Sequence, residues 1–150
     1  MTGDAYDRYF YGGGDTLINT LGIRDAEELH LVEYRESKLA MPEALNYARS
    51  QETLTPETLK GIHKILFGRL YAWAGQWRTM ALFKQATAFQ AFVSDERMAL
   101  ALERFEREGA ATARYVGPFA GELARLWADL NYEHPFVEER TREVRNCNFN

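Results

Sequence analysis

The sequence predicts a small, mostly α-helical domain with one short β element. Apolar side chains recur every three to four residues over several long segments, the pattern of helices that bury one face. Helix-capping residues stand in front of most of these segments, and only residues 79–93 show the weak alternation of a strand pair. We expect about six helices. The 150 residues fit one domain, 1–150, with a single core.

The composition is that of a globular protein and argues against several function classes. Apolar residues make up 46% of the chain and aromatic residues 13%, which is too apolar for a disordered chain. The net charge of −4 argues against a non-specific nucleic-acid binder. No run of about 18 apolar residues predicts a membrane span. The lone Cys147 fits a reducing compartment, and the histidines show no zinc-ligand spacing. We therefore expect a cytoplasmic protein with neither nucleic acid nor membrane as partner.

Residues 1–22 form an amino-terminal arm that is rich in tyrosine and glycine. The glycines at 12–14 mark a turn. Tyr9, Phe10 and Tyr11 stand before that turn, and three adjacent rings are costly to leave in water. We therefore expect these rings to pack against the body of the domain.

Two helical segments are expected between residues 25 and 51. Asp25 caps the first, with Glu28 three residues later as in a capping box. This helix extends to Leu39, because Pro42 interrupts the helical pattern. Residues 43–51 then form a second, shorter helix.

The next helix has a clear start. Thr55 is its cap, Pro56 its first residue, and Glu57 adds a negative charge to its first turn. Its apolar face carries Leu59, Ile62, His63, Leu66, Phe67 and Leu70. We interpret His63 on this face as a structural hydrogen-bonding residue.

Residues 71–79 place two tryptophans and a tyrosine around Gly75, which predicts a compact aromatic corner at the end of that helix. The hairpin expected within residues 79–93 follows. Ser94 then caps another helix, which frays near Gly109. The inner face of this helix carries Met98, Leu102 and Phe105.

The last helix opens at Gly117-Pro118 and ends in side chains suited to phosphate chemistry. Pro135 disfavours helical geometry at His134, which places the imidazole at the helix end. Glu138, Arg142 and Arg145 follow at i, i+4 and i+7 on one face of a further helical run. A histidine exchanges a proton near neutral pH, a glutamate holds a hard cation, and arginine matches phosphate oxygens.

The same residues also fit a plain helix–turn–helix corner. In that interpretation Glu138 and Arg142 form an exposed ion pair that contributes about 0.3–0.5 kcal/mol. His134 is then a polar cap, without a catalytic role.

Four separated segments resemble the Fic/Doc family, and together they span most of residues 5–145. They are the lead-in 9–23, the helix and Trp-Ala-Gly-x-x-Arg corner within 62–79, the hairpin segment 80–89, and His134-Pro135-Phe136. The resemblance implies a Fic-type helical bundle of about six helices, in which residues 79–93 form a β-hairpin flap.

Residues 134–145 match the family motif His-x-Phe-x-(Asp/Glu)-Gly-Asn-Gly-Arg-x-x-Arg in part. The matching residues are His134, Phe136, Glu138, Arg142 and Arg145. The family's corner is matched by Trp73, Gly75 and Arg78. The centre of the motif departs, because Glu139-Arg140-Thr141 stands where the family has Gly-Asn-Gly.

The resemblance implies the transfer of AMP from ATP to a Ser, Thr or Tyr hydroxyl of a target protein. His134 would be the general base and Glu138 the Mg²⁺ ligand. Arg142 and Arg145 would bind phosphates, and Arg140 would add to the positive charge. Phosphoryl-type transfer needs such a base, a divalent cation and positive charge on the phosphates.

The resemblance also implies partners. Lys84, Thr87 and Phe89 would belong to the flap, which aligns a target chain by strand addition. Family members are restrained by a helix with a Ser/Thr-x-x-x-Glu-Gly/Asn motif, supplied in the same chain or by a small antitoxin. No such motif occurs here, so an antitoxin would be a separate partner. A toxin would act in the bacterial cytosol, and a secreted effector in the host cytosol.

The altered motif centre predicts impaired or altered activity. Glycines let backbone N–H groups form an anion nest for the nucleotide's phosphates. A carboxylate at Glu139, at about 5 Å and an effective dielectric of about 20, repels a phosphate charge by roughly 3 kcal/mol before Arg140 offsets it. The chain also continues only five residues past Arg145, which predicts a short carboxyl end.

Two alternatives stay open at this point. The chain could be a non-catalytic Fic-fold protein that binds protein partners through its flap. It could also be a transferase that uses a different nucleotide donor, because Arg140 enlarges the positive set around the phosphates.

Overall fold

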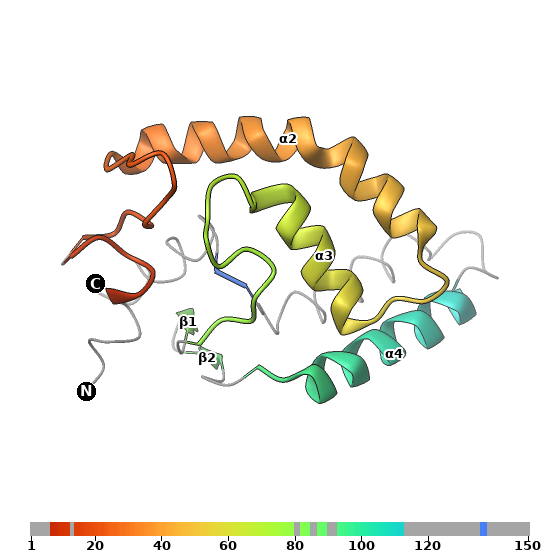
Figure 1. Cartoon of the computed structure of the whole chain (residues 1–150). Coiled ribbons are helices and arrows are strands. Elements are labelled where there is room, and N and C mark those ends of the chain that lie inside the picture. Colours follow the sequence, from red (N-terminus) through yellow and green to blue (C-terminus); the bar gives the residue numbers. More distant parts are fainter. Residues whose placement is uncertain are drawn as a thin grey trace.

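The structure is a computed structural model, and it describes residues 7–12, 14–79, 82–84, 87–89, 93–112 and 136–137. The elements in this part are the helices α2 (Ala26–Ser50), α3 (Pro56–Phe67) and α4 (Asp95–Thr112), and the strands β1 (Leu82–Lys84) and β2 (Thr87–Phe89). The fold is mostly helical, as predicted. Figure 1 shows α2 lying across α3, with α4 and the two strands on the other side of α3.

Helix α2 is one continuous helix, so the predicted break before Pro42 is wrong. The Asp25 side chain caps its start by accepting the Glu28 backbone N–H at 2.8 Å, as expected. A proline inside a helix removes one hydrogen bond and costs about 3 kcal/mol. Here Pro42 is exposed, so water can reach the carbonyl that loses its donor. Burial on both sides of it, at Leu29 and Ala44, offsets the cost because both halves pack toward the body.

Helix α3 begins as predicted and packs against α2. Thr55 and Thr58 form a reciprocal capping box, with Pro56 in the first turn. Helix α4 begins after Ser94, whose hydroxyl accepts the Arg97 backbone N–H at 3.2 Å. Helix α4 includes Gly109 and extends to Thr112, the last described residue of this segment. The alanines after Gly109 favour this extension, because alanine is the best helix former.

The amino-terminal arm is packed on the domain, as predicted. Phe10 and Leu17 form an antiparallel bridge around the glycine turn, and the Tyr11 N–H donates to the Thr16 carbonyl at 2.9 Å. Tyr9 and Phe10 are buried. The arm continues past the end of α3, where the Thr20 N–H donates to the Leu70 carbonyl at 2.8 Å.

The core joins this arm to the residues that follow α3. The buried cluster consists of Tyr9, Phe10, Leu17, Leu29, Leu70, Tyr71, Trp73, Ala74 and Val137. Its members come from the arm, from α2, from residues 70–74 and from the carboxyl-terminal motif. The core therefore lies where the predicted motif meets the rest of the chain.

Strands β1 and β2 pair in antiparallel fashion within the segment predicted to hold a hairpin. Leu82 lies opposite Phe89, and Lys84 lies opposite Thr87. The use of this pair as a target-binding flap stays a prediction. None of the helices in the described part of the chain combines the length and the apolar character that crossing a membrane requires.

Candidate functional site

The site is built on the aromatic corner that follows α3. The helix ends at Phe67, and hydrogen bonds from Ala74 N–H to the Tyr71 carbonyl (3.1 Å) and from Gln76 N–H to the Trp73 carbonyl (2.9 Å) turn the chain back. Gly75 has a φ of +81°, and a Cβ there would lie 2.9 Å from a backbone oxygen of α3. Only glycine fits this position without strain.

His63 connects the corner to α3. Its Nδ1 accepts the Gly75 backbone N–H at 3.0 Å, and only 4% of the residue is exposed. An accepting Nδ1 carries no proton, so a neutral ring carries its proton on Nε2. The interpretation of His63 as a structural hydrogen-bonding residue is confirmed.

The two described residues of the carboxyl-terminal motif, Phe136 and Val137, pack directly on this corner. The Trp73 Nε1–H donates to the Val137 carbonyl at 3.0 Å, and Val137 is fully buried. The Phe136 ring stacks on His63 with centroids 4.1 Å apart and planes 10° apart, and it lies 5.0 Å from the Trp77 ring. Residues more than sixty positions apart in sequence therefore form one packed unit.

The arm supports the corner from its other side. The Tyr9 ring meets Trp73 edge-on at 5.0 Å, and Tyr71 stacks on Trp73 at 5.1 Å. The Tyr9 hydroxyl lies 2.9 Å from the Thr79 hydroxyl and accepts the Thr79 N–H at 3.1 Å. This fixes the chain just ahead of the segment that holds β1.

A charged cluster ties α3, the corner and α4 together. The Asp95 carboxylate accepts the Lys60 ammonium at 2.8 Å and the Trp77 Nε1–H at 2.7 Å. Lys60 also lies 4.8 Å from the centroid of the Trp77 ring. The hydrogen bond to Lys60 holds the pKa of Asp95 below its usual range, and the same bond raises the pKa of Lys60.

The chain is similar in sequence to proteins of known name. No family model matches the sequence. The chain is 29% identical over 135 residues to the "Probable protein adenylyltransferase Fic" of Escherichia coli K12, covering 89% of this chain and 66% of that protein. It is 29% identical over 132 residues to the "Protein adenylyltransferase VbhT" of Bartonella schoenbuchensis, covering 86% of this chain and 27% of that protein.

Solved structures give the same result. The amino-terminal Fic domain of a Bartonella effector protein from Bartonella sp. AR 15-3 superposes with a TM-score of 0.56 at 29% identity, covering 92% of this chain and 68% of that one. The Fic domain of Bep8 from Bartonella sp. 1-1C superposes with a TM-score of 0.61 at 25% identity, covering 91% and 70%. The chain is therefore similar to Fic domains over most of its length. It spans just under two thirds of the Escherichia coli relative.

The structure describes all four residues that the resemblance assigns to the structural motif. Trp73, Gly75 and Phe136 meet at the corner, and Arg78 lies buried beside it. Lys84, Thr87 and Phe89 lie in the paired strands. The remaining predicted site residues, His134, Glu138, Arg140, Arg142 and Arg145, lie outside the described residues.

Sequence reasoning missed several residues that support the corner. Glu33 is buried on the inner side of α2, and its carboxylate accepts a hydrogen bond from the Tyr71 hydroxyl. The sequence does carry a signal for Glu33. The helical periodicity predicts an apolar residue at this position, and the residue is acidic instead. The Lys60–Asp95 pair had no such signal, because its members stand 35 residues apart on separate helices.

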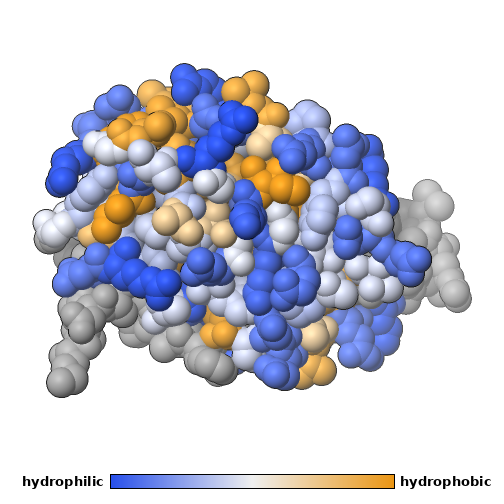
Figure 2. Space-filling model, in the orientation of Figure 1, coloured by the Kyte–Doolittle hydropathy of each residue, from blue (hydrophilic) through white to orange (hydrophobic). Residues whose placement is uncertain are grey.

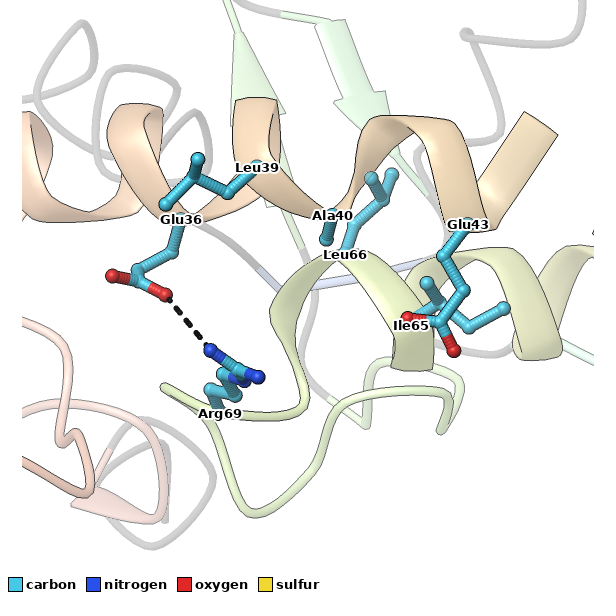
Figure 3. A pocket seen from close by; sticks show the side chains of 7 residues that line it. All are labelled: Glu36, Leu39, Ala40, Glu43, Ile65, Leu66 and Arg69. Atoms are coloured by element: carbon cyan, nitrogen blue, oxygen red, sulfur yellow. Dashed lines mark ion pairs between the residues drawn. The ribbon is translucent and has the colours of Figure 1, made fainter. Parts of the chain in front are cut away.

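A cavity of about 210 Å³ between α2 and α3 is separate from this site (Figure 3). Its lining residues are Glu36, Leu39, Ala40, Glu43, Ile65, Leu66 and Arg69. The Glu36 carboxylate and the Arg69 guanidinium face each other across it at 3.8 Å. None of the predicted site residues lines this cavity. Among the described residues, no group of three or more His, Cys, Asp or Glu side chains is placed to hold a metal ion.

Proposed function

We propose that the chain transfers AMP from ATP to a Ser, Thr or Tyr hydroxyl of a target protein. One observation carries the proposal: the Trp73 Nε1–H donates to the Val137 carbonyl while Phe136 stacks on His63. These contacts fasten the backbone two and three residues after His134 to a rigid aromatic corner. The relatives named as protein adenylyltransferases support the same activity.

The side chains around this anchor suit the reaction. His134 would take the proton of the target hydroxyl as its oxygen attacks the α-phosphorus and the bond to pyrophosphate breaks. Arg142 and Arg145 would hold the phosphate oxygens. The Glu138 carboxylate is a hard oxygen donor of the kind that Mg²⁺ binds, so the donor set fits this ion. When bound, Mg²⁺ supplies positive charge that offsets the charge on the phosphates.

We propose that the β1–β2 pair presents the target to this site. A two-stranded sheet has open edges whose N–H and C=O groups can pair with an extended chain. Lys84, Thr87 and Phe89 stand on its paired strands, and Tyr9 fixes Thr79 just ahead of them. Partner and compartment follow from this proposal: a protein substrate, in the bacterial cytosol or in a host cell's cytosol. An antitoxin would act as a separate inhibitor.

We further propose that this activity is weaker than in chains that keep Gly-Asn-Gly. Glu139-Arg140-Thr141 adds side chains and one carboxylate where backbone N–H groups would approach the phosphates. Arg140 offsets part of that charge. The same feature favours a second candidate, a transferase that takes a different nucleotide donor.

The deciding experiment is calorimetric titration with ATP and Mg²⁺, with Arg142→Ala as the control. We expect weak binding that the control loses. Magnesium-dependent labelling of a protein target that His134→Ala abolishes would support AMP transfer. Labelling that requires another nucleotide would support the second candidate.

One result would rule out both AMP transfer and the use of a different nucleotide donor. Absence of binding and of labelling with every nucleotide would leave a non-catalytic interaction protein of the Fic fold. In that case the search moves to proteins retained by the β1–β2 pair, with Phe89→Ala as the variant that should release them.

A further inference from the structure

Two contacts between Tyr9 and Thr79 join a buried residue of the arm to an exposed residue of the corner. The Tyr9 hydroxyl accepts the Thr79 backbone N–H at 3.1 Å and lies 2.9 Å from the Thr79 hydroxyl. Tyr9 is 1% exposed, whereas Thr79 is exposed. A buried tyrosine hydroxyl needs a hydrogen-bond partner, and Thr79 supplies it. The exposed residue is therefore held in place by the buried one.

Tyr9 is a rigid point of support. Its ring meets Trp73 edge-on at 5.0 Å within the buried core cluster. Its carbonyl accepts the Ile18 backbone N–H at 2.8 Å, which ties its backbone to the part of the arm that returns after the glycine turn. Since both the ring and the backbone are held, the hydroxyl has a fixed position relative to the core.

Thr79 lies at the start of the segment that carries the strand pair. Strand β1 begins at Leu82, and α4 begins at Asp95 after the second strand. The Trp77 Nε1–H donates to the Asp95 carboxylate at 2.7 Å, so the two ends of this segment are joined. Tyr9 holds the chain just past that junction, on the side that leads into β1. The arm thus contributes to the base on which the strand pair stands.

The strand pair would be recognised through its backbone edges and not through an apolar patch. On the face that Figure 2 shows, apolar groups gather over the part of the surface where α2 lies in Figure 1. The paired strands offer edge N–H and C=O groups, and the direction of these groups follows the direction of the strands. If the base shifts, only a fraction of the molecules present an edge that fits the target, and the apparent affinity falls by that fraction.

We propose that Tyr9 is a positioning residue, whose hydroxyl holds the β1–β2 pair in the placement that binds the target. This inference rests on the proposed function, in which the strand pair presents the target to His134. It gives the arm a role in target binding in addition to its place in the core. That function assigns the nucleotide to Arg142 and Arg145, so loss of the Tyr9 hydroxyl should weaken target binding and not ATP binding.

The first test measures amide hydrogen exchange in the strand pair of the full chain and needs no ligand. Tyr9→Phe keeps the ring on Trp73 and removes both contacts with Thr79. Because a two-stranded pair opens locally, its exchange reports local opening and not global unfolding. We expect the amides of residues 82–84 and 87–89 to exchange about fivefold faster, the usual effect of losing one hydrogen bond.

Two controls separate positioning from stability. Tyr71→Phe removes the hydroxyl of an equally buried tyrosine that stacks on the same Trp73 ring, but that hydroxyl donates to Glu33 of α2. It should leave exchange in the strand pair unchanged. Thr79→Ser keeps both contacts and should behave as the wild type, whereas Thr79→Val loses one. Unchanged exchange in Tyr9→Phe, or an equal increase in Tyr71→Phe, overturns the proposal.

The second test separates this proposal from the proposed function. It uses radiolabelled ATP and a protein that the wild-type chain labels. In Tyr9→Phe we expect the KM for that protein to rise about fivefold, with kcat and the KM for ATP unchanged. A fall in kcat alone, or an equal rise in both KM values, overturns the role in target binding. If the wild type labels no protein, the proposed function fails, and the exchange result alone decides whether Tyr9 positions the strand pair.

Discussion

At the residue scale, the hydrogen bond from Trp73 to Val137 joins the carboxyl-terminal motif to the core. The indole N–H is the sole polar group of a buried ring, and the carbonyl that accepts it belongs to a fully buried residue. If the Trp73 indole N–H is removed, the buried Val137 carbonyl is left without this hydrogen-bond donor. Such a loss costs about 1–3 kcal/mol.

We therefore expect Trp73→Phe to lower the free energy of unfolding by about 1–3 kcal/mol, because the buried Val137 carbonyl loses its donor and the ring loses volume. Denaturant unfolding followed by circular dichroism measures this. The control is Trp77→Phe, whose N–H donates to the exposed Asp95. A smaller loss in Trp73→Phe than in the control would contradict the role of this contact.

A second prediction at this scale concerns the effect of a side chain at Gly75 on stability. Gly75→Ala should destabilise the fold by about 1–3 kcal/mol from the positive φ alone, with the close approach to α3 adding to it. Gly12→Ala is the matched control, because a Cβ at Gly12 would meet nothing within 4 Å. Thermal melts of both variants give the comparison. Equal melting temperatures would show that the corner relaxes freely.

At the element scale, polar contacts join separate elements in the part of the chain that the structure describes. The Lys60–Asp95 pair links α3 to α4, and the Tyr71–Glu33 hydrogen bond links α2 to the corner. The two pKa shifts at the first pair make the stability of the fold fall at both ends of the pH scale.

Stability should depend on pH through this pair. Asp95 has a lowered pKa, so its contribution is complete above the unfolded value of 3.8 and is lost as the pH falls through the folded value below that. Lys60 has a raised pKa, so its contribution is complete below 10.5 and is lost as the pH rises beyond it. Urea unfolding across pH should show both losses. In Asp95→Asn the part of each loss that belongs to this pair should disappear, and an unchanged profile would contradict the assignment.

Pro42 gives the second prediction at the element scale. Pro42→Ala restores one backbone hydrogen bond of α2 and should raise the free energy of unfolding by about 1–3 kcal/mol, the upper end being the proline penalty. Equilibrium unfolding measures the gain. Pro56→Ala is the control, since a proline in the first helical turn costs nothing and its replacement should give no gain. A loss of stability in Pro42→Ala would contradict this prediction.

At the scale of the whole molecule, the corner supports a carboxyl-terminal motif whose centre departs from the family pattern. If Glu139 and Thr141 weaken phosphate binding, their replacement should restore it. We expect the double variant Glu139→Gly with Thr141→Gly to bind Mg-ATP more tightly by about 3 kcal/mol, or roughly 100-fold, as the charge repulsion predicts. Calorimetry measures the change, with Arg140→Ala as a control for the positive charge. Unchanged affinity would show that the motif centre does not limit binding.

The sequence by itself determined the class of the fold and the local starts of its elements. Asp25 and Thr55 cap their helices where the pattern predicted, because capping depends only on residues within one turn. The burial of Tyr9 and Phe10 was also predictable, because adjacent aromatic rings are costly to leave exposed to water. The continuity of α2 through Pro42 was not predictable from the sequence. The cost of a proline inside a helix predicted a break, but the packing of α2 against α3 outweighed that cost.

Only the tertiary structure decided which distant residues meet. The stack of Phe136 on His63 and the hydrogen bond from Trp73 to Val137 join segments whose positions along the chain carry no mutual signal. The physical reason is common to these cases: caps and periodicity are set by neighbours in sequence, whereas burial is set by the whole fold.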